Sequence, residues 1–423
     1  MHLKRSNSLN GRSLIATHTV SNTPPEQQEE VPMNDIVILS GVRTAIGGFG
    51  GALSSHAPHE LGAITARAAL ARAYVAPDQI DMTVFGHVIN TEPKDMYLSR
   101  LVAMNAGVPE TAPSMNVNRL CGSGVQAVVS AAQALQLGDA EFALAGGAET
   151  MSRAPYALPS ARFGQKMGDS SVVDMLVGTL TCPFGTGHMG ITAENVAAKH
   201  GISREDQDSF ALESQNRAAR AIAEGYFIDQ IVPVECKTRK GIVQFATDEH
   251  PKHSTLEALT SLKPAFRQDG SVTAGNASGI NDGAAAVVLA RATAAEQAGL
   301  TPIARILGYS VAGVRPEIMG MGPVPAVEQL LTKTGLSVDD FDVIESNEAF
   351  AAQAAAVSRA LKLDPERVNP NGGAIALGHP VGATGTILLV KAMAELTRTG
   401  GKRALVTMCI GGGQGIALAI ERP

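Results

Sequence analysis

The chain has 423 residues and a mass of 43.7 kDa, about three times the usual domain length of ~150 residues, which excludes a single small module. Hydrophobic residues make up 45% and charged residues 17% of the sequence, a balance that excludes wholesale disorder. The formal net charge of −6 argues against a general affinity for nucleic acid. We find no apolar run of about 18 residues or more, so we expect no membrane partner.

The N-terminal segment 1–32 differs in composition from the rest of the chain. It carries Lys4, Arg5 and Arg12, several serines, no acidic residue before Glu26 and no apolar periodicity, so we expect it to be a disordered extension. The segment is either a transit-like peptide or an upstream addition before a natural start at Met33. A strand-like sequence directly after Met33 favours the second, and the lack of an apolar signal core favours a cytoplasmic protein.

Four cysteines are spread over the chain without the spacing of a metal site. Cys121, Cys182, Cys236 and Cys409 form no CxxC motif and no Cys/His pattern. They indicate neither a disulfide framework nor a zinc site, and they favour a reducing compartment. We therefore expect no bound metal.

Strand and helix patterns alternate along the chain with short connections, which is the signature of an α/β fold. In the first part, strands are expected near 36–43, 83–89, 115–120 and 142–149, and helices over 60–74, 98–107 and 124–138. In the last part, strands are expected over 341–346 and 403–410, and helices over 324–335, 349–363 and 382–396.

The two parts match each other. A constant shift in numbering of 261, the difference between 339 and 78, carries Asp78 onto Asp339 and Gly124 onto Gly385, along with the order of the elements. A duplicated α/β half explains this best. We place the first half at 33–150, completed by about 281–298, and the second half at 299–423.

Residues 151–280 read as an insertion between the halves, because they are irregular, rich in Pro and Gly, and locally basic. One helix is expected over 203–224, opened by a capping box at Ser203. The basic run Lys237, Arg239 and Lys240 is either a solvated hairpin or a site for an anionic ligand.

Cys121 follows a strand and precedes a helix in the segment CGSG, where helix-end amides would stabilise a thiolate nucleophile. His379 lies in the glycine-rich segment ALGHPVGATG, and the constant shift places it on Asn118, just before Cys121. A Cys/His pair in one cleft is the functional interpretation. The alternatives are a buried structural cysteine and a histidine that only caps a loop.

Cys409 ends a strand before the glycine run 411–415, whose amides could face an oxyanion. A dinucleotide-binding loop is disfavoured, because a strand and not a helix follows the glycines. Asn347 opens the segment NEAF between a strand and a helix, as either a helix N-cap or a polar group at the sheet end.

The segments CGSG, NEAF, GHP and CIG, in this order and in two matching halves, resemble the thiolase family from about Asn34 to the end. The resemblance implies a fold of two βαβαβαββ halves in an α-β-α-β-α layered core, with a coenzyme A-binding loop domain. It also implies a homotetramer that uses acetyl-CoA, 3-ketoacyl-CoA and CoA as substrates, with no permanently bound cofactor.

The resemblance also implies residue roles. Cys121 would be acylated, His379 would take its proton, and Cys409 would move a proton at the Cα of the second acyl-CoA. Asn347 would hold a water beside His379, and the amides of Cys121 and Gly411 would form an oxyanion hole. Residues implied to contact CoA are His188, Met189, Lys237, Arg239, Lys240, Ala274, Ser278, Met319 and Phe350.

The activity implied is acetyl-CoA C-acetyltransferase or 3-ketoacyl-CoA thiolase. Three other classes stay open: a decarboxylating ketoacyl synthase of the same fold, an NAD-dependent oxidoreductase, and a non-catalytic acyl-CoA-binding relative. Cys409 and NEAF argue against the synthase, and the missing strand-GxGxxG-helix unit argues against the oxidoreductase.

Overall fold

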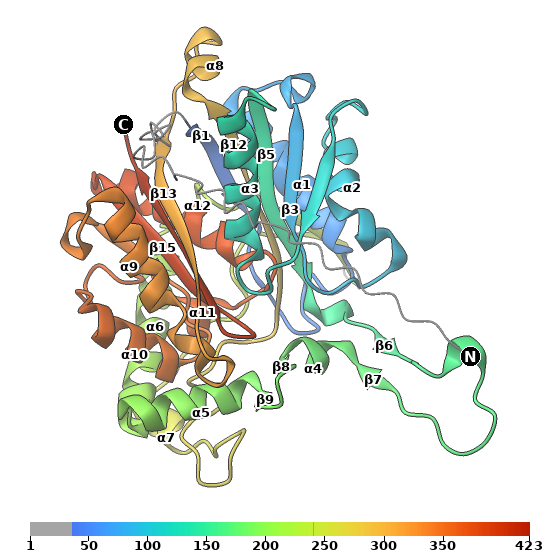
Figure 1. Ribbon diagram of the computed structural model, residues 1–423, viewed down its shortest axis with the longest axis vertical. Helices are drawn as coiled ribbons and strands as arrows, with labels where there is room; N and C mark the ends of the chain where they lie inside the picture. Colours follow the sequence, from blue (N-terminus) through green and yellow to red (C-terminus); the bar gives the residue numbers. More distant parts are fainter. Residues whose placement is uncertain (1–35, 240) are drawn as a thin grey trace, which may run out of the picture. The chain divides into compact units, whose positions relative to one another are not determined.

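A computed structural model describes residues 36–239 and 241–423, so the expected extension 1–32 and the start at Met33 lie outside the described residues. A ten-stranded sheet organises the described chain in the order β14-β15-β16-β13-β1-β12-β5-β3-β4, with β2 (Gly47–Gly48) pairing β12 (Figure 1). Strands β1 and β13 share only the pairs Val37–Arg305 and Ile38–Ala304. The two halves of the sheet are thus joined by a short stretch of pairing between β1 and β13.

The first half has mostly buried strands flanked by three helices. Its elements are β1 (Ile36–Arg43), α1 (Pro58–Ala73), β3 (Met82–Gly86), α2 (Leu98–Asn105), β4 (Ser114–Val117), α3 (Ser123–Leu137), β5 (Phe142–Thr150) and β12 (Asn281–Arg291), followed by the short α8 (Ala292–Gln297). Strands β4, β3 and β5 are parallel, and β12 pairs antiparallel with β5 and β1.

The second half repeats this arrangement. Its elements are β13 (Ala304–Gly313), α9 (Pro323–Thr334), β14 (Val343–Ser346), α10 (Ala351–Leu361), α11 (Ala374–Leu377), α12 (Thr384–Thr399), β15 (Arg403–Ile410) and β16 (Gln414–Glu421). A parallel bridge between Ile344 and Val368 stands where β4 pairs with β3 in the first half. The strand order is the same in both halves, which confirms the predicted duplication.

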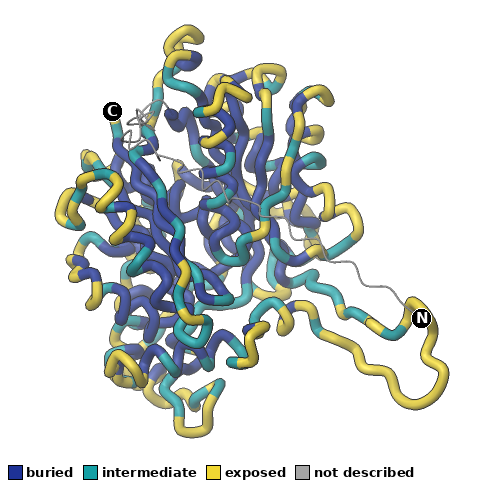
Figure 2. The backbone as a smooth tube through the Cα atoms, viewed as in Figure 1, coloured by how far each residue is buried: buried dark blue, intermediate teal, exposed yellow. Residues whose placement is uncertain are grey.

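The layers follow from where the apolar side chains lie. Helices α3 and α12 pack on each other, α3 on strands of the first half and α12 on strands of both halves, so they form the central layer. Helices α1 and α2 cover the first half, and α9 and α10 cover the second. Separate apolar clusters fill the middle and the two outer layers, and Figure 2 shows the strands and central helices as buried. The expected layered fold is confirmed.

Helices α3 and α12 cross at Gly124 and Gly385, where each helix presents bare backbone to the other. A Cβ on Gly124 would lie 2.6 Å from the backbone nitrogen of Thr386, and a Cβ on Gly385 would lie 2.4 Å from that of Val125. These two glycines are equivalent under the constant shift that relates the halves. The N-terminal ends of both central helices therefore meet at a pseudo-twofold axis.

The segment between the halves is built from short elements and two longer helices. They are β6 (Tyr156–Ala157), β7 (Val173–Asp174), α4 (Met175–Thr179), β8 (Thr181–Cys182), β9 (Gly187–His188), α5 (Met189–His200), α6 (Arg204–Ala223), β10 (Val234–Thr238), β11 (Gly241–Phe245) and α7 (Leu256–Thr260). Helix α6 opens with the predicted capping box, in which Ser203 pairs with Asp206.

The hairpin of β6 and β7 forms an exposed arm in Figures 1 and 2. In the part of the chain that the structure describes, every helix is too short or too polar to cross a membrane.

The helix crossing gives a stability prediction. Gly124→Ala should lower the free energy of unfolding by about 1–3 kcal/mol, because its methyl group would overlap backbone that cannot move aside easily. Gly178→Ala is the matched control, since a Cβ there meets no atom within 4 Å. Chemical denaturation of both variants measures the difference, and equal stabilities would contradict the tight crossing.

Candidate active site

Cys121 lies on a tight turn between β4 and α3. The expected strand 115–120 ends at Val117, because Asn118 Oδ1 accepts the amide of Leu120 at 3.0 Å and bends the chain. Leu120 has a φ of 46°, a left-handed conformation that costs a non-glycine residue about 1–2 kcal/mol. The amide of Gly122 then donates to the carbonyl of Arg119. The turn holds Cys121 just ahead of helix α3, which begins at Ser123.

The loop that carries His379 packs on bare backbone of the first half. A Cβ on Gly147 would lie 2.2 Å from the carbonyl oxygen of Gly382, and one on Gly86 would lie 2.7 Å from the same atom. The amide of Gly382 donates to Glu149 at 3.0 Å. Glycines on β3 and β5 therefore let the second half bring its histidine loop against the first.

Hydrogen bonds fix the His379 ring and its tautomer. Its Nδ1 lies 2.6 Å from Thr384 Oγ1, and the Thr384 hydroxyl donates to the carbonyl of Pro380. Thr384 must therefore accept the proton on Nδ1, which leaves a lone pair on Nε2. Burial lowers the pKa of His379 to about 4. The ring is thus a neutral base at physiological pH.

Asn347 lies beside His379, and Cys409 lies near Cys121. Asn347 is fully buried at the end of β14, with Nδ2 3.5 Å from His379 Nε2. Helix α10 takes Phe350 as its N-cap, so Asn347 is the polar group at the sheet end and not the cap. Cys409 is fully buried at the end of β15, packed with Met189, Met319 and Phe350.

The expected thiolate at Cys121 is wrong for the resting protein. Burial raises the pKa of the Cys121 thiol, although the amides of Gly411 and of Cys121 itself oppose the shift. Desolvation of the sulfur thus outweighs the helix-end amides. Burial and the nearby Cys121 also raise the pKa of Cys409. The two cysteines are therefore neutral thiols beside a neutral imidazole.

Cys121 and His379 line a mostly apolar cavity of about 420 Å³, whereas Asn347 and Cys409 are not among its lining residues. His188 and Phe266 stack on its wall with ring centroids 4.8 Å apart, and Phe350 meets Phe266 edge-on at 6.1 Å. Of the predicted site residues, the cavity is lined by Cys121, His188, Met189, Ala274, Ser278, Met319, Phe350, His379 and Gly411. The segment 151–280 supplies one wall, and residues of both halves supply the other.

Comparisons with known proteins agree with this arrangement. Residues 36–293 match the family model of the thiolase N-terminal domain, and residues 300–422 match that of the thiolase C-terminal domain. The chain belongs to the thiolase family. It is 60% identical to the β-ketothiolase BktB of Cupriavidus necator, over 92% of this chain and 99% of the relative. It is 47% identical to the mitochondrial 3-ketoacyl-CoA thiolase of Bos taurus, over 92% and 98% of the two chains.

Solved structures extend the likeness to three dimensions. The human mitochondrial 3-ketoacyl-CoA thiolase in complex with CoA matches this thiolase with a TM-score of 0.90 and 44% identity, over 92% of this chain and 98% of that chain. The acetyl-CoA acetyltransferase of Bacillus anthracis matches with a TM-score of 0.90 and 46% identity, over 93% and 100%. Both likenesses cover the two halves and the segment between them.

In the basic run of the thiolase, Lys237 and Arg239 do not line the cavity that contains Cys121, here called the cysteine cavity. Lys237 and Arg239 are exposed on the hairpin of β10 and β11, and Lys240 lies outside the described residues. Lys237 borders a separate depression with His56 and Glu60. A CoA contact for this run stays a prediction.

Sequence reasoning missed several residues of the thiolase site. Thr384 fixes the histidine tautomer, and the constant shift between the halves would have placed it on Ser123, whose hydroxyl also anchors a helix start. Phe266 came from irregular sequence with no periodic signal. Glu149 anchors the histidine loop through a backbone amide, a contact with no sequence motif.

The glycine run 411–415 forms a tight hairpin in the thiolase. Gly412 and Gly413 have φ values of 84° and 92°, and β15 pairs antiparallel with β16 directly after them. A dinucleotide-binding unit would continue into a crossover helix. The expectation that these glycines do not bind a dinucleotide is in keeping with this geometry.

The buried histidine predicts the acid limb of the pH profile. The pKa of His379 lies at about 4. As the pH is lowered, kcat/KM for thiolysis should therefore not fall near pH 6.5, where an ordinary histidine becomes protonated. The base should stay active as the pH falls, until it is protonated near pH 4. A pH series with a fixed thioester substrate measures this, and an acid limb near pH 6.5 would contradict a neutral buried base.

Proposed function

We propose that the chain is an acyl-CoA:acetyl-CoA C-acyltransferase that condenses two acetyl-CoA molecules or cleaves 3-ketoacyl-CoA with CoA. The observation that carries the proposal is the convergence of Cys121, His379 and Gly411 on one cavity, with Asn347 beside the histidine and Cys409 behind it. Such a reaction needs a nucleophile, a base and stabilisation of negative charge on oxygen.

In thiolysis, His379 Nε2 takes the proton of the Cys121 thiol, whose sulfur attacks the 3-keto carbon. The amides of Gly411 and Cys121, which face the sulfur, are close enough to stabilise the developing oxyanion. The bond between C2 and C3 then breaks. The acyl group stays on Cys121, and the enolate of acetyl-CoA leaves with its electron pair on the C2–C1–O system.

Cys409 then supplies the proton that converts the enolate into acetyl-CoA. Because the pKa of Cys409 is raised, its thiol keeps the proton until the enolate takes it. In the reverse direction, the Cys409 thiolate removes a proton from acetyl-CoA. Asn347 and His379 can together orient a water at the enolate oxygen, because Asn347 Oδ1 is buried without a hydrogen-bond partner among the described residues. The CoA thiol finally gives its proton to the Cys409 thiolate and attacks acyl-Cys121. The Cys121 sulfur leaves and takes back its proton from His379, and the second acyl-CoA is released.

The cavity supports a CoA thioester as the substrate. We place the pantetheine arm along His188, Met189, Ala274, Ser278, Met319 and Phe350, which line the cavity. Its walls also carry Leu180, Ile280 and Val381, which suit a short aliphatic acyl chain. We therefore expect cleavage of both acetoacetyl-CoA and a six-carbon 3-ketoacyl-CoA. The CoA thioesters are the only cofactor-like groups the mechanism needs, and the cytoplasm is the compartment we propose.

Substitution of the two cysteines separates their roles. Cys121→Ala should lower thiolysis of acetoacetyl-CoA at least about 1,000-fold and abolish the acyl-enzyme seen by intact-protein mass spectrometry. Cys409→Ser should still gain an acyl group at Cys121 but lose condensation, because a serine hydroxyl gives up its proton far less readily than a thiol. The matched control is Cys236→Ala, a buried cysteine in the outer layer of the first half, which should keep both activities.

Three outcomes would contradict these assignments. Wild-type thiolysis in Cys121→Ala would exclude the covalent route. No acyl-enzyme in Cys409→Ser would contradict its later role. A wild-type protein that binds CoA but is neither acylated nor active would indicate a non-catalytic acyl-CoA-binding relative.

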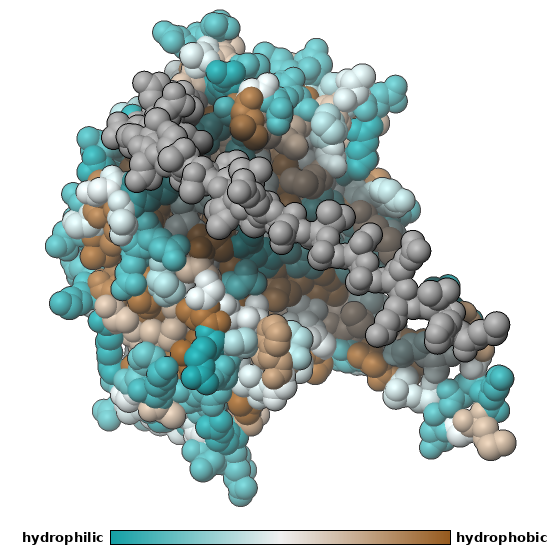
Figure 3. Space-filling view, viewed as in Figure 1, coloured by the Kyte–Doolittle hydropathy of each residue, from teal (hydrophilic) through white to brown (hydrophobic). Residues whose placement is uncertain are grey.

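We also propose a homotetramer, which rests on the family resemblance and on two exposed surfaces. The arm of β6 and β7 exposes Phe163 and Met167 at 91% and 92%. Strand β4 is an edge strand of the large sheet, and Figure 3 shows hydrophobic residues gathered toward the middle of that face, in the region of α3, β3 and β4. Open strand edges and exposed apolar side chains are typical of protein interfaces.

The mass in solution tests this assembly. Sedimentation should give four times the chain mass of 43.7 kDa, and the double variant Phe163→Ser, Met167→Ser should shift the protein to a smaller species. Tyr74→Ser is the control, because Tyr74 is 87% exposed at the end of α1 and is not part of the arm. A monomer at micromolar concentration, or no shift in the double variant, would contradict the proposed role of the arm.

A further inference from the structure

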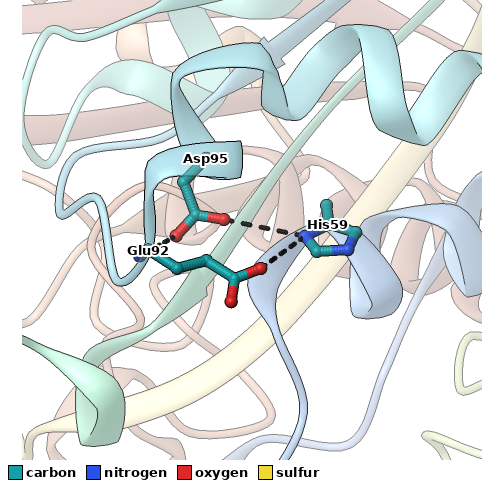
Figure 4. Close-up of side chains that lie close together, drawn as sticks. All are labelled: His59, Glu92 and Asp95. Carbon is teal, nitrogen blue, oxygen red and sulfur yellow. Dashed lines mark hydrogen bonds and ion pairs between the residues drawn. The ribbon is translucent and has the colours of Figure 1, made fainter.

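His59, Glu92 and Asp95 meet at a point where α1 approaches the loop after β3. His59 lies in the first turn of α1, and the two acids flank the start of a short 3-10 helix over Pro93–Tyr97. In Figure 4 both carboxylates point toward the imidazole. His59 Nδ1 lies 3.6 Å from Asp95 Oδ1 and 3.9 Å from Glu92 Oε1, beyond hydrogen-bond length in both cases.

Each carboxylate offers one oxygen to this point and uses the other elsewhere. Asp95 Oδ2 accepts from the amide and hydroxyl of Thr91, both at 2.7 Å, and from the amide of Glu92 at 3.2 Å. Glu92 Oε2 faces Arg153 at 3.7 Å. The remaining oxygens, Asp95 Oδ1 and Glu92 Oε1, are directed to the histidine.

The inward-facing atoms lack hydrogen bonds. Asp95 is fully buried, yet its Oδ1 has no hydrogen-bond partner among the described residues, and neither does His59 Nδ1. An unpaired buried carboxylate oxygen costs free energy, so it is normally satisfied by a donor or a cation. The free atoms therefore point to an occupant between them.

The spacing suits a metal ion. The three ligand atoms all lie within 4.8 Å of one another. A cation equidistant from them would lie no more than about 2.4 Å from each, and a small side-chain shift reaches the ~2.0–2.2 Å of zinc-ligand bonds. One imidazole nitrogen and two carboxylate oxygens favour a borderline ion such as Zn²⁺ or Mn²⁺.

We propose that His59, Glu92 and Asp95 bind one divalent metal ion, either Mn²⁺ or Zn²⁺. This departs from the expectation of no bound metal, which rested on the spacing of the cysteines. The side chains of His59 and Glu92 are 11% and 30% exposed, so water can fill the remaining coordination positions. The ion would tie the first turn of α1 to the loop after β3. None of the three residues lines the cysteine cavity, so the ion has a stabilising role and takes no part in the acyl transfer.

His87 and Arg153 lie near the cluster, and both face oxygens that point away from the metal position. His87 Nε2 lies 3.9 Å from Asp95 Oδ2, the oxygen turned away from the metal position. Arg153 Nη2 lies 3.7 Å from Glu92 Oε2, which also points away from the metal position.

Manganese binding tests the proposal directly. The full-length protein, stripped with EDTA and dialysed, should bind one Mn²⁺ per chain, measured as loss of the free Mn²⁺ signal in electron paramagnetic resonance. His59→Ala and Glu92→Gln should each weaken binding at least about tenfold. His253→Ala is the matched control, because it removes an exposed imidazole far from this cluster in the sequence and should leave binding unchanged.

A second readout is independent of the spectrum. Mn²⁺ or Zn²⁺ should raise the Tm of the wild-type protein and of His253→Ala, but not that of His59→Ala, because only a ligand of the folded state stabilises it. Asp95→Asn should behave like His59→Ala if it folds, and the other two variants suffice if it does not. Equal Mn²⁺ binding in wild type and His59→Ala, or no binding in either, would overturn the proposal. A proton on His59 Nδ1 would then fill the space between the three side chains.

Discussion

The close crossing of α3 and α12 is the constraint on which the rest of the structure depends. Gly124 and Gly385 allow backbone nitrogen atoms of the opposite helix to approach within the space that a side chain would need. Each helix begins just after a loop that carries a proposed catalytic residue, so their contact brings the Cys121 turn of one half to the His379 loop of the other. Packing of the Gly382 carbonyl on Gly86 and Gly147 completes that approach.

The same close packing sets the electrostatics of the site. The protein atoms packed around Cys121, Cys409 and His379 desolvate these groups and favour the neutral form of all three. A charged pair at rest would need solvation that this cavity does not offer. In the proposed reaction, charge develops only as the bonds change, and the amide of Gly411 is already oriented toward the sulfur. Thr384 maintains the tautomer that this sequence of proton transfers requires.

Much of the site could be predicted from the sequence, because its motifs lie at the ends of elements with clear periodicity. Cys121, Asn347, His379 and Cys409 each follow or precede a recognisable strand or helix. Phe266 and the His59–Asp95 cluster could not be predicted in this way. Phe266 lies in irregular chain, and His59 is separated from the acids it approaches by the rest of α1 and all of β3, a spacing with no motif to mark it.

The sequence by itself determined the order of the elements, the duplication and the identity of the chemical groups, because periodicity and motifs are local properties of the chain. Only the tertiary structure decided which atoms meet and what charge they carry. The helix-end position of Cys121 suggested a thiolate, whereas burial by residues distant in sequence raises its pKa. Desolvation depends on all the atoms that surround a group, and those atoms are brought together only by folding.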